Sequence, residues 1–425
     1  MANRLADSVS IAGVGCTRFG DLLSTEEIAG LTLQELAGRA VLEALGDAGM
    51  TARDMGAVFV GNVMVQSSHL PATYSQLSRW IGTQFKSGVH FDAACSTTNV
   101  GLALATQAIA SGAVDAALVL GLEATRNQPK GYSPYERDTI PSDQMWLWTD
   151  MCVDQAYAVP MGYDIFTTYN GIVGQAYCRK YDMSPDAYDH AMFELCRTRR
   201  LHASMNPKAI IQETLEDEAT RHGFDDPFEF WKSRLNPYIS WPARFRSVVT
   251  PADGASAMVL VRSSATNGLP NRPVQVLGFG TAVSDLPWYD ADPTDWKVDR
   301  VAFRNAFEMA GITAADIDYL HTHDCSHIMG ICMAETMGYL EPGKGLQAAE
   351  DGRLRFDGDR PMSTHGGRHA FGHAWAASAG ADTYEAVKQI RGQAGERQIP
   401  KPPEIAVVAT HGYAMISHTV VLKGN

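Results

Sequence analysis

The sequence predicts an α/β protein built from two similar halves, with a long insertion between them. Strand-like and helix-like segments alternate along most of the 425 residues, which is the pattern of sheets covered by helices. Residues 44–54 (ALGDAGMTARD) recur as residues 306–316 (AFEMAGITAAD), and such self-similarity indicates a duplication. The stretch from residue 126 to residue 245 breaks this pattern.

Each copy of the repeated segment combines a helix end with a turn. An amphipathic helical pattern stops at Gly49 in the first copy and at Gly311 in the second. A left-handed C-terminal cap is expected there, because glycine adopts that conformation without steric cost. The threonine two residues later, Thr51 or Thr313, can cap a short helical turn. Apolar strands are expected next, at residues 57–60 and 317–320.

The similarity between the halves extends in both directions. Upstream, residues 9–15 and 274–280 both read as a strand followed by a glycine turn. Downstream, a helix of small residues ends at Gly112 or Gly392 and leads to an apolar strand, at residues 116–120 and 405–409. Three matches in the same order make a duplication the best explanation.

The insertion contains two expected helices, near residues 171–180 and 186–204, and it is rich in prolines and aromatic residues, among them Trp146, Trp148, Tyr157, Trp231 and Trp241. We interpret it as a segment lying over the functional site; an excursion that only thickens the fold is the alternative. Residues 253–260 then return as an apolar strand to the first half. The predicted organisation is an N-terminal half (1–125 with 246–266), a loop domain (126–245) and a C-terminal half (267–425).

Charge and cysteine usage narrow the class of protein. The formal net charge of −13 argues against a nucleic-acid-binding surface, which needs clustered Lys and Arg. Residues 197–200 (RTRR) could meet a small phosphorylated ligand, but a solvated helix face is the preferred interpretation. Seven scattered cysteines without a CxxC pair fit reduced thiols. No apolar run reaches membrane-spanning length and no signal peptide is visible, so we expect a cytoplasmic protein that does not act on membranes.

Cys95 is the candidate nucleophile. It lies in residues 91–98 (FDAACSTT), directly before a helix of small residues. Unpaired N–H groups at a helix N-terminus favour a thiolate and can stabilise an oxyanion. A buried packing cysteine is the alternative reading.

His373 is the candidate base. Residues 363–374 (STHGGRHAFGHA) precede another small-residue helix, in the second half. The paired Gly366 and Gly367 let the backbone approach a ligand, and a histidine held in such a loop can activate a thiol. His365 and His369 are expected to be structural or lining residues.

A third cluster, residues 321–327 (HTHDCSH), follows a strand of the second half. If this segment stayed extended, its histidines and cysteine would share one side, as in some zinc sites. Because the chain must turn where the strand ends, catalytic use of His323 and Cys325 is favoured and no metal is expected. Near the C-terminus, residues 411–414 (HGYA) offer either a backbone donor at Ala414 or a plain turn.

These residues, in this order, resemble the thiolase superfamily over essentially the whole chain, with the sterol-carrier-protein-x type as the nearest likeness. The resemblance rests on an ordered set of segments: Gly13–Phe19, the Cys95 loop, Met161–Gly162, Ala252–Ala255, His323–Cys325, Gly366–Gly367 with Gly372–His373, and Arg391–Gln398.

The resemblance implies a five-layered α-β-α-β-α fold with an inserted loop domain that helps to bind coenzyme A, and a homodimeric core. It implies that Cys95 accepts the acyl group and that His373 takes its proton and contributes to an oxyanion hole. Cys325, in an HDC motif, would be the acid and base at the α-carbon, and His323 would take the oxyanion-hole place that asparagine fills in other thiolases. Coenzyme A would be a cosubstrate and no cofactor would be bound permanently, with Gly366, Gly367 and Ala414 as contacts.

The sequence also departs from the family pattern. Ala374 replaces a common proline, and Ser363–Gly367 replaces Asn-Pro-x-Gly-Gly. The stretch Thr-His-Gly-Gly is similar to that of thiolase-like subunits that pair with a small OB-fold, zinc-containing protein. The expected function is a thiolase acting on a bulky or aromatic β-ketoacyl-CoA. The alternatives are a retro-aldolase or C-acetyltransferase subunit working with an OB-fold partner, and a non-catalytic scaffold.

Overall fold

The computed structural model describes residues 8–63, 72–125, 165–284, 292–412 and 416–424. Among these residues, no helix is both long and apolar enough to cross a bilayer. The six cysteines in the described ranges are free thiols.

A single nine-stranded sheet runs through the molecule in the order β3-β2-β4-β7-β1-β8-β11-β10-β9. The first five of these strands come from the N-terminal half, and the last four come from the C-terminal half. They are β1 (Val9–Cys16), β2 (Ala57–Gly61), β3 (Ser87–Phe91), β4 (Ala116–Ala124), β7 (Asp253–Arg262), β8 (Val274–Val283), β9 (Tyr319–His321), β10 (Ile405–Gly412) and β11 (Ile416–Gly424). The halves join where β1 pairs with β8, through Ser10 with Gln275 and Ile11 with Val274.

Strand order and direction are the same in the two halves, so the predicted duplication is confirmed. The strands β2, β4, β7 and β1 correspond to β9, β10, β11 and β8, with one parallel pairing followed by two antiparallel pairings in each set. The predicted left-handed glycine caps are present at Gly49 (φ 64°) and Gly311 (φ 69°). A short helical turn follows each one, with the threonine hydroxyl donating to an aspartate three residues later.

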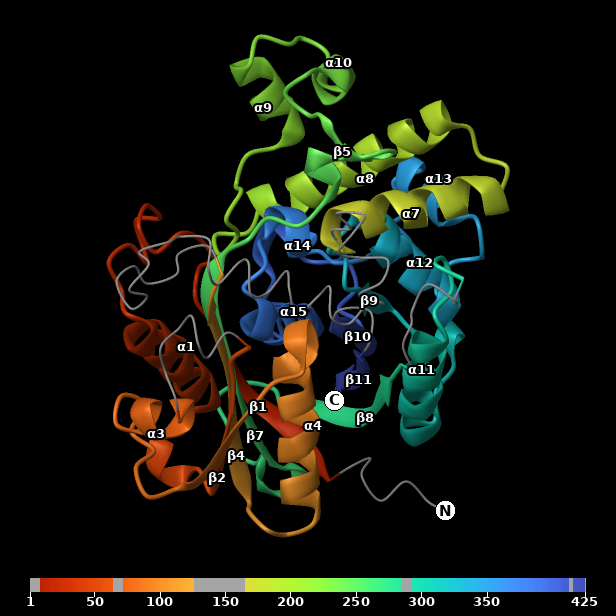
Figure 1. Ribbon diagram of the computed structural model, residues 1–425. Coiled ribbons are helices and arrows are strands. Elements are labelled where there is room, and N and C mark those ends of the chain that lie inside the picture. Colours follow the sequence, from red (N-terminus) through yellow and green to blue (C-terminus); the bar gives the residue numbers. More distant parts are fainter. Residues whose placement is uncertain (1–7, 64–71, 126–164, 285–291, 413–415, 425) are drawn as a thin grey trace, which may run out of the picture.

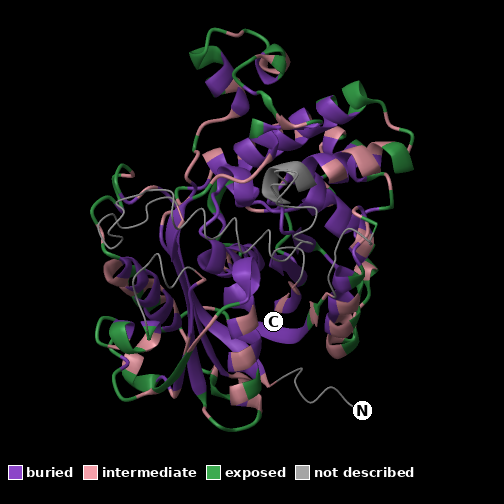
Figure 2. Ribbon diagram, viewed as in Figure 1, coloured by how far each residue is buried: buried purple, intermediate pink, exposed green. Residues whose placement is uncertain are grey.

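Four helices form the remaining layers. The helix α1 (Leu33–Ala48) covers the outer face of the N-terminal half, and α11 (Lys297–Ala310) covers that of the C-terminal half. Between the two parts of the sheet lie α4 (Thr97–Ala110) and α15 (Trp375–Arg391), which contact each other and strands of both halves. Figure 1 shows α4 in front of α15 between these strands, so the layering is α-β-α-β-α, as predicted. Figure 2 shows buried, intermediate and exposed residues along α4, while most residues of α15 are buried.

The described part of the insertion is helical, and the two expected helices are present. The insertion contains α7 (Ile165–Lys180), α8 (Pro185–Ser204), α9 (Leu215–Arg221), α10 (Pro227–Lys232) and the short strands β5 (Tyr238–Ser240) and β6 (Ala243–Arg244). α8 packs on α12 (His327–Met337), α13 (Gly345–Glu350) and α14 (Gly367–Ala370) of the C-terminal half. The one other helix of at least four residues in the described ranges is α3 (Thr73–Ser78), beside β3. Trp146, Trp148 and Tyr157 lie outside the described residues, while Trp231 is a core residue that donates to Asp189.

Paired glycines let each outer helix lie close to its strand. A Cβ atom on Gly280 would lie 2.7 Å from the amide nitrogen of Ala306 and would overlap the carbonyl oxygen of Ala302. Gly15 makes the equivalent approach to Ala40 and Ala44 in the first half. The turns predicted at these glycines were wrong, because Gly15 lies inside β1 and Gly280 lies inside β8. The glycines instead allow close packing of α1 on β1 and of α11 on β8.

We expect Gly280→Ala to lower the free energy of unfolding by about 1–3 kcal/mol, because backbone atoms of α11 cannot yield without moving the helix. Urea unfolding followed by circular dichroism measures this change. Gly46→Ala is the matched control: no atom lies within 4 Å of its Cβ position, and alanine in a helix should stabilise by about 0.5–1 kcal/mol. Equal stability of the Gly280→Ala variant and the unmodified chain would contradict the argument.

Candidate active site

Cys95 lies at the start of the central helix α4. The strand β3 ends at Phe91, and a short turn over Ala94–Ser96 leads into the helix. Ala94 has a left-handed backbone (φ 49°), which is unfavourable for a residue with a Cβ atom and marks a locked turn. The turn is held by the Ala93 N–H, which donates to Thr97 Oγ1 at 2.8 Å. Cys95 is buried and its sulfur lies at the helix N-terminus, as predicted.

His373 approaches Cys95 from the equivalent position in the other half, just before α15. Its Nε2 lies 3.1 Å from Cys95 Sγ, and its Nδ1 lies 2.9 Å from Ser378 Oγ. The Ser378 hydroxyl oxygen also accepts from the Ala374 N–H at 2.9 Å. Serine therefore orients the imidazole, and a proton on Nδ1 leaves Nε2 free to accept from the thiol.

Cys325 and His323 complete the cluster from the loop between β9 and α12. Cys325 Sγ lies 2.7 Å from His323 Nε2, and the rings of His323 and His373 lie 5.6 Å apart. The other histidines of this segment turn elsewhere: His321 contacts His365, and His327 contacts His369. The four side chains therefore do not share one side, as expected where a strand ends.

The pKa values of the two thiols, Cys95 and Cys325, are shifted in opposite directions. A hydrogen bond with Cys325 and the imidazole of His373 hold the pKa of Cys95 well below its ordinary value, against the effect of burial. Burial and the neighbouring Cys95 sulfur raise the pKa of Cys325 well above its ordinary value. Cys95 is therefore the more acidic of the two groups and is suited to attack as a thiolate, while Cys325 keeps its proton and is suited to giving it. Burial lowers the pKa of His323, so this imidazole is neutral.

Among the residues that the structure describes, two groups of side chains lie close enough to hold a metal, but neither fits one. Ligand atoms of Cys95, His323 and His373 lie within 4.8 Å of one another, yet Cys95 and His373 already face each other as thiol and base. His321, His365 and Asp382 form the second group. There the Gly367 N–H donates to His365 Nδ1 at 3.0 Å, so Nε2 carries the proton and points at Asp382. A protonated nitrogen is not a metal ligand.

Buried ion pairs that sequence reasoning missed support the HDC loop. Arg199 donates to Asp324 at 2.9 Å, and although burial opposes ionisation, Arg199 keeps the pKa of Asp324 well below its ordinary value. Arg368 donates to both Asp382 oxygens, at 2.7 and 2.5 Å. The interpretation of residues 197–200 as a solvated face was wrong for Arg199 and Arg200, which are buried, because α8 is covered on the side facing α14.

The glycines predicted to meet a ligand have close protein neighbours. A Cβ on Gly367 would overlap the Asp324 carboxylate, and one on Gly366 would lie 2.7 Å from the Ala203 Cβ of α8. His365 stacks on Phe371 and His369 bonds to the Val248 carbonyl at 2.9 Å. Both act as structural residues, as expected. Ala414 lies outside the described residues.

His411 also belongs to this region and was not singled out from sequence. Its ring lies 6.2 Å from that of His323, and its Nε2 donates to Asp299 on α11. Its position at the carboxyl end of β10 was the available signal, since α/β proteins gather site residues at such ends.

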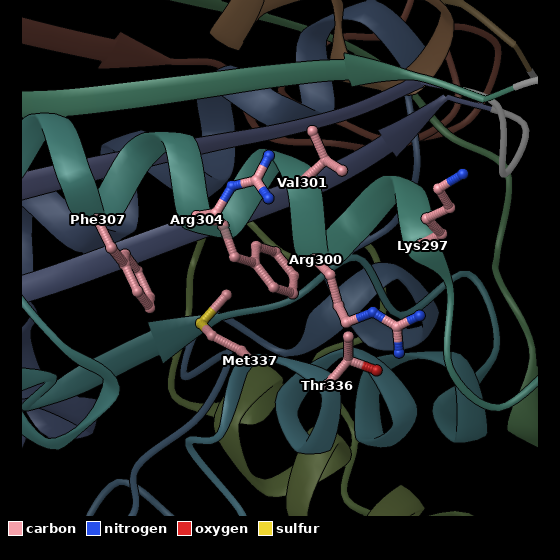
Figure 3. A pocket seen from close by; sticks show the side chains of 8 residues that line it. Lys297, Arg300, Val301, Arg304, Phe307, Thr336 and Met337 are labelled. Carbon is pink, nitrogen blue, oxygen red and sulfur yellow. The ribbon is translucent and has the colours of Figure 1, made fainter.

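A surface groove between α11 and the end of α12, of about 500 Å³, is separate from this cluster. Figure 3 shows that Lys297, Arg300 and Arg304 line it, together with Phe307 and Met337. Arg300 pairs with Asp295, and Arg304 approaches Glu308 at 4.0 Å. The two arginines thus already have carboxylate partners, and none of the predicted catalytic residues lines the groove.

Comparisons with known proteins agree with this architecture. Residues 9–191 match the family described as "Thiolase, N-terminal domain", and residues 288–425 match "Thiolase C-terminal domain-like". An acetyl-CoA acetyltransferase of Methanothermobacter thermautotrophicus is 28% identical over 396 residues, covering 92% of this chain and 93% of the relative. The benzoylsuccinyl-CoA thiolase subunit BbsB of Thauera aromatica is 26% identical over 420 residues, covering 96% of each.

Solved structures share the fold. The structure described as "Ltp2-ChsH2(DUF35) aldolase" aligns with a TM-score of 0.78 at 18% identity, covering 99% of this chain and 98% of that one. Human mitochondrial 3-ketoacyl-CoA thiolase aligns with a TM-score of 0.66 at 16% identity, covering 99% of each chain. The chain therefore belongs to the thiolase superfamily, and it is an enzyme of the acyltransferase class.

Proposed function

We propose that this enzyme is a thiolase that makes or breaks the bond between the α- and β-carbons of a β-ketoacyl-CoA through an acyl-enzyme on Cys95. The observation that carries the proposal is the 3.1 Å contact of Cys95 Sγ with His373 Nε2, beside a second thiol–imidazole pair, Cys325 and His323, at 2.7 Å. The first pair suits acyl transfer, and the second suits proton transfer at carbon.

In the cleavage direction, the Cys95 thiolate attacks the β-carbonyl carbon, and the bond to the α-carbon breaks. The electron pair leaves on the acyl-CoA fragment as an enolate, which takes a proton at carbon from Cys325. Coenzyme A then gives its thiol proton to the Cys325 thiolate and attacks the acyl-enzyme, which releases the shortened acyl-CoA and restores Cys95. Condensation is the reverse sequence.

The imidazoles have separate duties in this scheme. His373 takes the proton of Cys95 and afterwards donates to the oxyanion formed at the β-carbonyl. His323 donates to the enolate oxygen, which needs this help because a free thioester enolate is too basic at neutral pH. Each hydrogen-bond donor of this kind is worth about 10²–10³-fold in rate.

The relatives support a class of substrate and a cosubstrate. The relative from Thauera aromatica is named for benzoylsuccinyl-CoA and matches 96% of this chain, which supports a bulky or aromatic acyl group. We propose coenzyme A as cosubstrate, with no permanently bound cofactor and with the loop domain over residues 126–245 contributing to its binding.

The exposed edge of the sheet supports a homodimeric core. The strand β3 is the outermost strand, and its first three residues are exposed. Trp80, Phe85 and Val89 present large apolar side chains beside it, with 57%, 106% and 45% exposure. An unprotected apolar edge of this kind is unusual in a monomer. We propose that two copies meet along it.

A second candidate function is retro-aldol cleavage with an OB-fold, zinc-containing partner. It is favoured by the TM-score of 0.78 with the structure described as an aldolase of two named components. Because that reaction needs no acyl-enzyme, Cys95→Ala would retain activity under this alternative. A non-catalytic scaffold fits less well, since two thiol–imidazole pairs are kept in one cluster.

We expect incubation with acetyl-CoA to add one acetyl group to Cys95, visible by intact-protein mass spectrometry and peptide mapping. Cys95→Ser should lose the adduct, because its hydroxyl is far less acidic than a thiol. Cys178→Ser is the matched control, since Cys178 lies on α7, outside the cluster. If the native enzyme forms no adduct with any of a range of acyl-CoAs, the result would contradict the thiolase proposal.

We also expect Cys95 to react with iodoacetamide at neutral pH. The thiolate is the reactive form, so a lowered pKa brings half-maximal reactivity to a pH well below 9.0, the ordinary value for a thiol. Cys325→Ala and His373→Asn each remove a cause of this lowering and should move the profile to higher pH. Cys178, whose pKa burial raises, should react only at higher pH. Identical profiles for Cys95 and Cys178 would rule the argument out.

Light scattering coupled to gel filtration should give a dimer, with the subunit mass of 46.2 kDa doubled. The double change Phe85→Asp with Val89→Lys places charges on the apolar edge and should shift the protein towards the monomer. Leu42→Lys is the control, because Leu42 is 71% exposed on α1, away from β3. A monomeric native protein would refute this assembly.

A further inference from the structure

A buried pair of a histidine and a carboxylate, His411 and Asp299, borders the active-site cluster. His411 is the seventh residue of β10, and the next residue, Gly412, lies against the nucleophile loop: its Cβ would stand 2.7 Å from the Ala93 carbonyl oxygen. The imidazole stacks on Trp296, with ring centroids 4.5 Å apart and planes at 18°. His411 is buried, so its orientation is fixed by these contacts.

The hydrogen-bond partner of His411 determines which of its ring nitrogens carries a proton. Its Nε2 contacts a carboxylate oxygen of Asp299, which is itself buried in the first turn of α11. Because an ionised carboxylate only accepts, Nε2 must carry a proton. The other ring nitrogen, Nδ1, is buried and has no hydrogen-bond partner among the described residues. It is the atom through which this pair can act.

His323 needs a hydrogen-bond donor at its Nδ1 atom. It is a neutral imidazole, so only one of its nitrogens carries a proton. To donate to an enolate oxygen from Nε2, it must keep that proton on Nε2, which leaves a bare lone pair on Nδ1. This Nδ1 is also buried without a hydrogen-bond partner in the described part of the chain. A buried acceptor left unpaired is unfavourable, so a donor is needed to favour this tautomer.

We propose that Asp299 and His411 form a positioning pair that holds His323 in the tautomer with its proton on Nε2, ready to donate to the enolate oxygen. Asp299 holds the proton of His411 on Nε2, which leaves His411 Nδ1 able to accept from a water that also donates to His323 Nδ1. The ring centroids lie 6.2 Å apart and neither Nδ1 has a direct partner among the described residues, so the proposed link runs through a water. The inference rests on the proposed thiolase function and assigns two further residues to its carbon-acid step.

The Asp299–His411 pair acts on enolate formation and not on the acylation of Cys95. His373, with Ser378 behind it, activates Cys95, while His411, with Asp299 behind it, prepares His323. Loss of Asp299 should therefore impair enolate formation and spare the acylation of Cys95. A merely structural role would affect both steps together, because both depend on the same folded cluster.

The experiment compares two readouts on the same preparations. Exchange of the α-protons of acetyl-CoA in D₂O, followed by NMR, reports enolate formation, and acetylation of Cys95, followed by mass spectrometry, reports the other step. We expect Asp299→Asn and His411→Phe to slow exchange by about 10–100-fold and to leave the acetylation rate unchanged. His418→Asn is the control: His418 is a buried imidazole on the neighbouring strand β11, bonded to Thr281, and both rates should stay at the native level.

The ¹⁵N chemical shifts of labelled histidine give the direct test of the tautomer. In the native enzyme, His323, assigned by comparison with a His323→Gln sample, should show a protonated Nε2 and a hydrogen-bonded, unprotonated Nδ1. In Asp299→Asn the proton should move to Nδ1. Unchanged exchange in both variants, equal losses in exchange and acetylation, or an unchanged tautomer would overturn the inference. Failure of the native enzyme to acetylate Cys95 would instead count against the thiolase function itself.

Discussion

The packing of α4 against α15 is the contact on which the site depends. Cys95 lies two residues before α4 and His373 lies two residues before α15, so the two side chains meet only because the N-termini of these helices meet. Small residues make the approach close: Gly380 lies against Thr98, and Thr383 donates to Asn99 at 2.8 Å. His373 is fixed further by its backbone N–H, which donates to the Thr250 carbonyl at 2.9 Å. The geometry of the reacting atoms is thus set by backbone and helix packing, not by flexible side chains.

Two buried ion pairs lie around the contact between α4 and α15 but are not part of it. Arg199 with Asp324 and Arg368 with Asp382 form ion pairs with almost no solvent exposure. Such pairs contribute little net stability, but removal of one partner leaves an uncompensated charge and costs about 3–5 kcal/mol. The guanidinium of Arg368 also lies close enough to lower the pKa of Cys95. The ion pairs therefore fix the HDC loop and add positive potential beside the thiolate.

Much of the architecture could be predicted from sequence, because it follows local rules. The glycine caps at 49 and 311 need only the neighbouring residues to be interpreted, and the pattern occurs twice. The positions of Cys95 and His373 at helix starts were predictable for the same reason. His323 and Cys325 were singled out by the HDC pattern, with roles taken from the family resemblance. The glycines of β1 and β8 were expected to form turns but lie inside strands, because their role is the close approach of a helix that only tertiary packing brings there. The contacts of Arg199, Arg368 and Asp299 were not predictable, since each pairs residues that only tertiary packing brings together. Residues 197–200 show the limit of local reasoning: a charged stretch on a helix looks solvated until the covering helix is known.

The matched placement of Cys95 and His373 has a consequence for how such chemistry can arise. They occupy equivalent positions in the two repeats, each just before a central helix. Two identical subunits meeting about a twofold axis would present the same side chain at both positions, either two thiols or two imidazoles. Fusion of the copies into one chain removes that restriction, because each position can then mutate alone. A thiol and an imidazole can therefore face each other at equivalent positions of a twofold-symmetric fold only when the two copies differ in sequence.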